Sequence, residues 1–405
     1  MKVVVLGVGA QGSIIARRLS ELSGVHELIC ADYDETAAKR VAASLKKSRA
    51  VVLDAGQLER VIAVSEGSAL IVNALPPDFN PNVMQAALKN GCCYQDLASG
   101  PVEDTDFISS VKRQLALDGE FASAGLSALF NTGSAPGLVS VLARNAVDKL
   151  ETVDSILIAI YDGIWTNRFI PFWWSPETAF GDMAAEPVNF VNGRFETVEP
   201  YHDPQIIDFR GLGPRRVVDH EHEEPVTFGL LSDKAAKGCK NVRFKYGGPA
   251  VDLSESLYKM GLLSHEAVEV GGVKVVPLDL VCKLTPPAPA DAESIREALS
   301  EGMAQEEGAT LVRVDGTVGG KKVRIDSYVN APGLTEAFAE HGITHETFLT
   351  GQSAFAFSKL FVDGRITRKG VFPPELLDRE TRYRYLADLA DLGVAVDEIV
   401  ETRLF

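Results

Sequence analysis

The sequence predicts an α/β fold: a doubly wound parallel sheet interrupted by an inserted α+β domain. Apolar strand runs alternate with helical segments up to about residue 145. From there to about residue 345, period-2 alternation indicates a largely antiparallel sheet. Helical periodicity returns after residue 345, without further strands to cover. We therefore predict one domain of residues 1–145 plus 346–405, and an inserted domain of residues 146–345.

The composition argues against several classes of partner and location. A chain of 405 residues, 46% hydrophobic and 24% charged, is typical of a globular protein with two domains. Its net charge of −16 disfavours nucleic acid and anionic membranes as partners. No apolar run reaches the roughly 18 to 20 residues of a membrane span, and the start lacks a basic signal-peptide region. Five cysteines, an odd number without a CxxC pair, indicate the cytoplasm.

The first thirty residues carry the strongest local signal. A β-branched strand is followed by Gly7, Gly9 and Gly12 in G-x-G-x-x-G spacing and then by a helix. In a Rossmann dinucleotide-binding fold these glycines permit a tight turn, and the helix N-terminus binds the pyrophosphate. Asp32 ends the second strand, where an acid holds the adenosine ribose hydroxyls. The expected cofactor contacts at this turn are Gly7, Gly9, Ala10, Gln11, Gly12, Asp32 and Tyr33.

Polar residues also end the following strands. Asp54 closes RAVVLDAG, Asn73 closes the strand before Pro76-Pro77, and Asp96 lies in CCYQDLAS. Asp54 either contacts adenine or caps its turn. Because the carboxyl ends of parallel strands share one edge, these side chains and Asp32 indicate a site on that edge. The further cofactor contacts expected there are Asn73, Ala74, Leu75, Pro76 and Ser134.

A second glycine-rich turn, NTGSAPGLVSVLA, opens another helix. Gly133, Pro136 and Gly137 precede its apolar run. Bare N–H groups at this helix start could face the nicotinamide end of the cofactor or an anionic group of the substrate. Close packing at a helix start explains the same glycines, and the residues alone leave both interpretations open.

Hydride transfer requires a positioned carbon, charge partners for the substrate and a group that moves a proton. Asp96 is our first candidate for proton transfer or ammonium binding, although a carboxylate that caps a loop is the alternative. Lys245, our second catalytic candidate, and Arg243 could present cations to a carboxylate; solvent exposure is their alternative. The expected substrate contacts are Tyr94, Gly133, Gly137, Arg168 and Arg243. Tyr161, Asp162 and Trp173-Trp174 could line the pocket, but buried core is commoner for such aromatics.

The histidines do not indicate a metal site. His220 and His222, with Glu224, would share one face of a strand, but DHEHEEP is more typical of a hydrated edge or loop. His341 and His345 have helical spacing, yet the residues between them disfavour a helix, and no HExxH motif is present. We expect no catalytic metal.

Several segments together resemble the saccharopine dehydrogenase family. They are VVVLGVGAQGS, LIVNALPP, CCYQDLAS, GSAPGL and the tail GQSAFAFSKLFVDGRITRKGVFPPELL. The segment around FWWSPETAF is most similar to the lysine 6-dehydrogenase branch. The resemblance implies a Rossmann domain, an α+β domain for substrate binding and dimerisation, and NAD(P)-dependent interconversion of an amine and an imine. It also implies that the second glycine turn lies between the domains, near nicotinamide and substrate.

The sequence therefore predicts a cytoplasmic, homodimeric oxidoreductase that acts on the C–N bond of an amino acid or amine-derived substrate. NAD is favoured over NADP, because Asp32 would repel the phosphate of NADP. One alternative is a semialdehyde or carbonyl dehydrogenase, which needs a nucleophilic cysteine or an acid–base histidine in the second domain. The other is a sensor that binds NAD without turnover.

Overall fold

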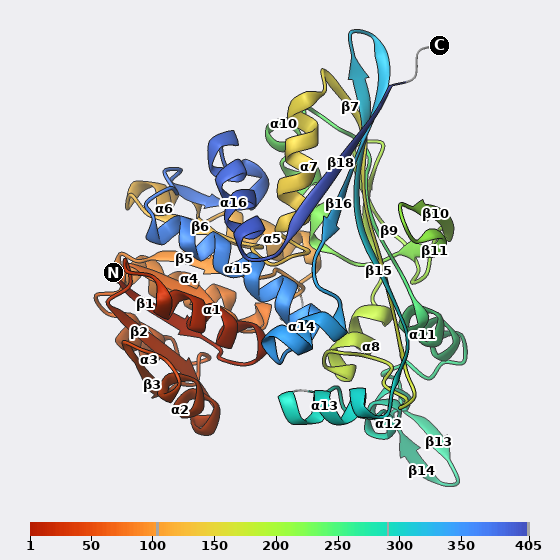
Figure 1. The fold of residues 1–405 in the computed structure, drawn as a ribbon, viewed down its shortest axis with the longest axis horizontal. Helices are drawn as coiled ribbons and strands as arrows, with labels where there is room; N and C mark the ends of the chain where they lie inside the picture. Colours follow the sequence, from red (N-terminus) through yellow and green to blue (C-terminus); the bar gives the residue numbers. More distant parts are fainter. Residues whose placement is uncertain (103–104, 290, 403–405) are drawn as a thin grey trace. The chain divides into compact units, whose positions relative to one another are not determined.

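The computed structural model describes residues 1–102, 105–289 and 291–402, which form two units (Figure 1). Unit 1 contains residues 1–149, 230–237 and 347–395, and unit 2 contains residues 150–229, 238–346 and the chain from Val396 onward. These bounds differ from the expected ones in two places. The short segment 230–237 groups with unit 1. The last strand, β18 (Ala395–Thr402), belongs to the sheet of unit 2.

Unit 1 is built on a parallel sheet in the order β17-β6-β5-β4-β1-β2-β3. Its strands are β1 (Lys2–Leu6), β2 (Glu27–Asp32), β3 (Ser48–Val52), β4 (Leu70–Asn73), β5 (Cys93–Asp96), β6 (Ser127–Leu129) and β17 (Gly370–Phe372). Its α-helices are α1 (Ala10–Glu21), α2 (Glu35–Ala43), α3 (Leu58–Ser65), α4 (Asn80–Asn90), α5 (Phe107–Leu115), α6 (Asp118–Ser123), α7 (Leu138–Lys149), α10 (Ser232–Ala235), α15 (His345–Val362) and α16 (Arg379–Asp391). Short 3-10 helices span Pro77–Phe79 and Pro374–Leu376.

The central strands are continuous apolar runs because both faces of the sheet are covered. Val3, Val4 and Val5 of β1 are completely buried. β1 pairs with β2 on one side and with β4 on the other, so the strand order reverses at this point. Dinucleotides bind beside such a reversal, at the carboxyl ends of the strands.

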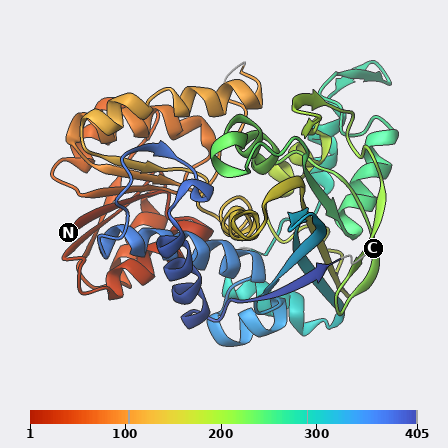
Figure 2. The same ribbon diagram turned by 90° about the horizontal axis from the view of Figure 1, so that it is seen from above.

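The end of the chain completes unit 1. β17 adds a parallel strand beside β6, and α15 packs so closely on α1 that a Cβ at Gly351 would lie 3.0 Å from Ile14. The buried guanidinium of Arg382 on α16 donates to Asn145 Oδ1 on α7 at 2.8 Å and pairs with Asp148. In Figure 2 the blue segments that precede β18 accordingly lie beside the red and orange segments of the N-terminus.

The main sheet of unit 2 is largely antiparallel, as predicted, and it is mixed because β12 and β7 run parallel. The main order is β10-β11-β12-β7-β15-β16-β18, and β12 pairs with β7 in parallel. A hairpin with Gly319-Gly320 at its turn joins β15 and β16. The strands are β7 (Thr152–Thr166), β8 (Val188–Val191), β9 (Arg194–Thr197), β10 (Gln205–Phe209), β11 (Gly213–Asp219), β12 (Val242–Gly247), β15 (Met303–Val318) and β16 (Lys321–Asn330), with a separate hairpin of β13 (Val268–Val270) and β14 (Val273–Val275). The helices are α8 (Pro176–Ala184), α9 (Glu223–Leu230), α11 (Pro249–Lys259), α12 (Pro277–Leu284), α13 (Ala292–Ser300) and α14 (Leu334–His341).

The predicted α/β class with a Rossmann-type sheet is confirmed by this architecture. A search of the described residues for a helix with the length and apolar character of a membrane span finds none.

Candidate functional site

The first glycine turn fits a bound pyrophosphate. Gly7 has a φ of +79°, and a Cβ there would lie 2.8 Å from the carbonyl oxygen of Ala74. A Cβ at Gly12 would come within 3.0 Å of the Gly7 backbone, so both positions require glycine for packing. A Cβ at exposed Gly9 would meet nothing within 4 Å. α1 starts at Ala10 without a capping side chain or an acid in its first turn, which leaves its first N–H groups available for phosphate oxygens.

Asp32 is held against this turn at the end of β2. Its side chain is largely buried; Oδ2 accepts the Val8 N–H at 2.8 Å and Oδ1 accepts the Asp34 N–H at 3.0 Å. The neighbouring Tyr33 is 81% exposed. The carboxylate is therefore fixed where a Rossmann fold holds the adenosine ribose. The residues of this turn fit a nicotinamide dinucleotide.

Other predicted cofactor residues lie along the same sheet edge. Asp54 is exposed and accepts the Gly56 N–H and Gln57 Nε2, both at 2.9 Å, so it caps its own turn. Asn73 is buried, and its Nδ2 donates to Asn80 Oδ1 at 2.8 Å. Of the remaining candidates, Ala74, Leu75 and Gln11 are partly buried, Pro76 is exposed and Ser134 is buried.

Asp96 lies at the end of β5 but is completely enclosed. Its Oδ1 accepts the Asn131 N–H at 2.7 Å, and its Oδ2 accepts the Tyr94 hydroxyl and Gln114 Nε2, both at 2.9 Å. Burial raises the pKa of Asp96 to about 7, although these hydrogen bonds oppose the shift. The arrangement ties the loop at Asn131 to β5. It favours a positioning role for Asp96 over the direct proton transfer expected from sequence, and it places the predicted substrate residue Tyr94 in the same buried network.

We expect the Asp96→Asn variant to change the pH dependence of stability. In the unfolded chain this carboxyl titrates near its ordinary value of 3.8, whereas in the folded protein it keeps its proton to about pH 7. The stability that Asp96 contributes is therefore present below about pH 4 and is lost as pH rises to 7. The unfolding free energy of the wild type minus that of the variant should fall by on the order of 2 to 4 kcal/mol over this range. Urea unfolding at pH 4.5 and 7.5 measures this difference, and an unchanged difference would contradict the shifted titration.

The second glycine turn is packed against itself. Gly137 has a φ of +129°, and a Cβ there would lie within 3.0 Å of the Gly133 backbone. The Leu138 and Val139 N–H groups at the start of α7 donate to the carbonyls of Gly133 and Ser134 at 3.1 and 3.0 Å. These N–H groups are thus already satisfied. The geometry favours tight packing at a helix start over the binding of an anionic group by these two donors.

Lys245 and Arg243 are neutralised inside unit 2. Lys245 is completely buried, and its Nζ lies 2.7 Å from Asp219 Oδ1 and 3.1 Å from Asp203 Oδ2. Arg243 NH1 lies 2.8 Å from Asp219 Oδ2 and 3.1 Å from the same Asp203 oxygen. Two aspartates thus balance two cations, and solvent exposure is the wrong interpretation for Lys245. The pairs reduce the ability of either cation to hold a substrate carboxylate.

Two further residues of unit 2 were predicted to contact the substrate: Arg168 lies on the surface and Trp173 lies in the core. Arg168 is exposed, and its Nε donates to Glu301 Oε1 at 3.0 Å. Trp173 is 5% exposed and packs in an apolar cluster with Ile170 and Leu334. The core interpretation therefore applies to this tryptophan.

His222, Glu223 and Glu224 form a buried group, which we call the His222 cluster. Sequence reasoning did not predict that these side chains are buried. β11 ends at Asp219, so His222 lies in a loop, and Glu223 and Glu224 begin α9. His222 Nδ1 lies 2.5 Å from Glu224 Oε2 and 3.1 Å from Glu223 Oε2, and its ring stacks on Phe244. Burial opposes protonation, but the two carboxylates outweigh it and raise the pKa of His222 to about 9. Glu223 and Glu224 are 6% and 0% exposed, so a hydrated edge is wrong for these acids.

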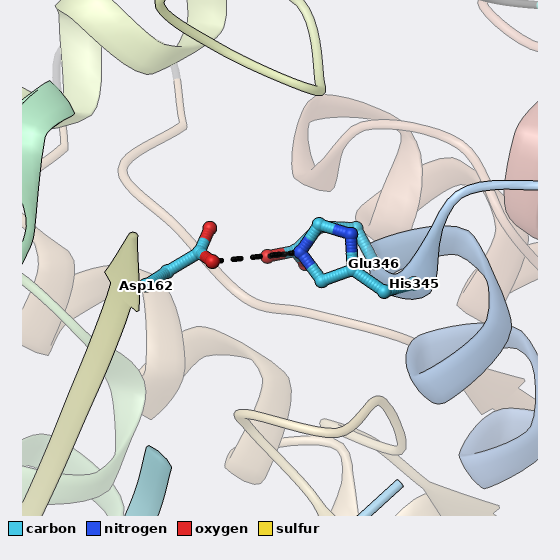
Figure 3. A group of neighbouring side chains, drawn as sticks. All are labelled: Asp162, His345 and Glu346. Carbon is cyan, nitrogen blue, oxygen red and sulfur yellow. Dashed lines mark ion pairs between the residues drawn. The ribbon is translucent and has the colours of Figure 1, made fainter. Parts of the chain in front are cut away.

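A second histidine lies between two carboxylates at the start of α15. Figure 3 shows Asp162, near the end of β7, pointing toward His345 and Glu346. His345 Nε2 lies 3.6 Å from Asp162 Oδ1 and 3.7 Å from Glu346 Oε1. Burial lowers the pKa of His345, but these acids outweigh it and raise the pKa to about 9. α14 ends before Gly342, so His341 and His345 belong to different helices, and sequence spacing gave no signal for this cluster.

The chain matches two family models over most of its length. Residues 3–129 match the saccharopine dehydrogenase NADP binding domain, and residues 133–394 match the saccharopine dehydrogenase C-terminal domain. Carboxyaminopropylagmatine dehydrogenase of Synechocystis sp. is 24% identical over 410 residues and covers 98% of both chains. Carboxynorspermidine synthase of Vibrio alginolyticus is 24% identical over 422 residues, covering 97% of this chain and 96% of the relative.

Two solved structures have the same fold at low sequence identity. Saccharopine dehydrogenase (L-Glu forming) from Saccharomyces cerevisiae is 15% identical, with a TM-score of 0.69 over 99% of each chain. Homospermidine synthase from Legionella pneumophila, solved in complex with NAD, is 13% identical, with a TM-score of 0.70 over 100% of this chain and 92% of that one.

Proposed function

The chain belongs to the saccharopine dehydrogenase family, and we propose that within it the protein forms or oxidises the secondary amine of a carboxyalkyl polyamine. It is an NAD(P)-dependent oxidoreductase of amine or imine substrates, as the sequence predicted. Known relatives of similar length carry the names of carboxyaminopropylagmatine dehydrogenase and carboxynorspermidine synthase. A polyamine is therefore a better proposal than the lysine-type substrate that the lysine 6-dehydrogenase resemblance implied.

In the proposed reaction the cofactor exchanges the hydride and the protein positions the reactants. The bound nicotinamide exchanges a hydride with the carbon of the C=N or C–N bond. The glycine turn and Asp32 hold the dinucleotide in place. The buried network of Asp96, Tyr94 and Gln114 fixes the strand ends and the loop at Asn131, on the edge where the dinucleotide binds. The remaining requirement is recognition of a substrate that carries several ammonium groups.

The observation that carries the polyamine proposal is the group of buried acidic side chains in the His222 cluster, one of which has an unsatisfied oxygen. Glu223 and Glu224 surround one imidazole, and Oε1 of the fully buried Glu224 has no hydrogen-bond partner in the described structure. Burial, and after it repulsion from Asp182, raises the pKa of the adjacent Glu221 to about 7. A substrate ammonium would satisfy the buried oxygen and relieve this repulsion. Lys245, by contrast, is already paired with Asp203 and Asp219, so it does not favour a substrate with two carboxylates.

Oxidation assays with NAD test the substrate class. We compare carboxynorspermidine and carboxyaminopropylagmatine with saccharopine and lysine, using the full-length chain. The kcat/KM of at least one carboxyalkyl polyamine should exceed those of saccharopine and lysine by tenfold or more. Higher values for saccharopine or lysine would overturn the proposal.

Glu224→Gln should raise the KM for the polyamine by roughly 10- to 100-fold, because a neutral amide loses one charge-assisted hydrogen bond worth about 1.5 to 3 kcal/mol. The exposed Glu196→Gln on β9 removes an equal charge from unit 2 and should leave the KM unchanged. Steady-state kinetics with both variants make the comparison. Equal KM values in the two variants would place the ammonium elsewhere.

The geometry of Asp32 also supports NAD over NADP. The phosphate of NADP would bring a second negative charge close to this fixed carboxylate. Unit charges about 4 Å apart repel by about 4 kcal/mol at an effective dielectric of about 20, and salt reduces this. We expect at least a tenfold preference for NAD in kcat/KM, about 1.4 kcal/mol. Asp32→Ser with Tyr33→Arg should erase it by replacing repulsion with a phosphate-binding guanidinium. Equal use of both cofactors by the wild type would contradict this account.

The expected cytoplasmic location and homodimer are also proposals. None of the five cysteines, all within the described residues, forms a disulfide, and Cys30, Cys92 and Cys239 are buried, which suits a reducing compartment. Light scattering during size-exclusion chromatography should give a mass near twice the chain mass of 43.7 kDa. A mass near 43.7 kDa would exclude the dimer.

A further inference from the structure

The group formed by Asp162, His345 and Glu346 has distances that a hydrogen-bonded ion pair does not explain. A charge-assisted hydrogen bond places nitrogen and oxygen about 2.7 to 2.9 Å apart. His345 Nε2 instead lies 3.6 and 3.7 Å from its two carboxylate oxygens (Figure 3). Both ring nitrogens are buried without a hydrogen-bond partner in the described part of the chain. Such an orphaned polar atom costs about 1 to 3 kcal/mol, so we expect a further partner at Nε2, the nitrogen that lies near both carboxylates.

The His222 cluster provides an internal comparison. It has the same composition, one histidine and two carboxylates. There the distances are 2.5 and 3.1 Å, so the imidazolium bonds to its carboxylates directly. The wider spacing at His345 is therefore a property of this site and not of the residue types.

The spacing also discriminates between possible cations. A metal ion with bonds of about 2.0 to 2.2 Å holds tetrahedral ligands roughly 3.3 to 3.6 Å apart. An ammonium nitrogen about 2.8 Å from each acceptor holds them roughly 4.6 Å apart. The observed 3.6 and 3.7 Å lie at and just above the upper end of the metal range, far below the spacing around an ammonium. We propose that Asp162, His345 and Glu346 bind one divalent transition-metal ion.

The ligand set indicates which ions fit. One imidazole and two carboxylates suit Zn²⁺ and Mn²⁺, and two carboxylates balance the charge of either ion when His345 is neutral. Three protein ligands leave a coordination position open for water or a substrate atom. The site departs from our expectation of no catalytic metal and does not rest on the proposed substrate. Its ligands come from β7 and from the first two residues of α15, which also belong to unit 2, so the ion would link two segments of that unit that are far apart in the sequence.

Titration calorimetry of the full-length chain, stripped by a chelator, tests the site with Zn²⁺ alone and with Mn²⁺ alone. We expect one equivalent of at least one ion to bind. His345→Gln and Asp162→Asn should each weaken that binding by 100-fold or more. His265→Gln, which removes a histidine of unit 2 outside both clusters, and His222→Gln should bind as the wild type does. Circular dichroism and NADH binding establish that each variant is folded.

Cobalt provides a readout independent of affinity. Co²⁺ in a tetrahedral site of nitrogen and oxygen ligands gives visible d–d absorption, which should appear with the wild type and disappear with His345→Gln. Absence of binding to the wild type would overturn the proposal. So would equal binding to His345→Gln and Asp162→Asn, which would mean adventitious metal only.

Discussion

We expect that a chain ending at residue 345 will neither form a stable unit 1 nor bind NAD. The deletion removes β17 from the edge of the sheet and exposes the face that α15 and α16 cover. Large apolar side chains buried on α15 include Phe348, Phe355, Phe357, Leu360 and Phe361. Each buried side chain of this size contributes about 1.5 to 3 kcal/mol, so their loss rivals the 5 to 15 kcal/mol of a whole domain. Calorimetric titration of the truncated chain with NAD measures the loss of binding, and thermal unfolding measures the loss of stability.

A shorter deletion controls for the loss of the chain end itself. A chain ending at Ala395 loses all of β18 except its first residue, and this strand belongs to the sheet of unit 2. It should keep the NAD affinity of the full chain. If the chain ending at residue 345 also bound NAD with full affinity, unit 1 would not need its C-terminal segments, and the discontinuous domain would be wrong.

Features encoded by neighbouring residues could be predicted from the sequence. The run Val3–Val5, the glycine spacing after it and the acid that ends β2 each follow from local chemistry, and the structure has a parallel sheet at these positions. Gly12 illustrates why. Its need for a hydrogen in place of a side chain comes from Gly7, five residues away, so the short motif contains both partners.

Features that depend on distant partners could not be predicted. β12 pairs with β7 in parallel because the segment between them returns to the end of the sheet at which β7 begins, and no local pattern indicates that crossover. Lys245 has the pattern of an exposed strand residue, but Asp203 and Asp219 bury and neutralise it. The Asp162 and His345 pair likewise comes from separate elements, so only the fold reveals their spacing.

Gly137→Val should destabilise unit 1 by at least about 4 kcal/mol and abolish turnover. The added Cβ would come within 3.0 Å of the Gly133 backbone, which cannot move aside as a flexible side chain could. The φ of +129° at Gly137 is also a conformation that β-branched residues avoid. Leu138, which follows directly, is completely buried at the start of α7, so the loop cannot shift without unpacking that helix. A change of this size exceeds the usual effect of a single substitution.

Thermal unfolding should show the loss as a decrease in Tm of about 10 °C, given roughly 2 to 4 °C per kcal/mol for a unit of this size. Gly119→Val is the matched control: this exposed glycine of α6 has nothing within 4 Å of an added Cβ, so its Tm should change little. NAD binding at low temperature, where the variant is still folded, separates two roles of the turn. Normal affinity in a destabilised Gly137→Val variant means that the glycine serves packing, as the satisfied N–H groups of α7 indicate. Full stability with lost affinity would instead mean that the cofactor approaches this backbone directly.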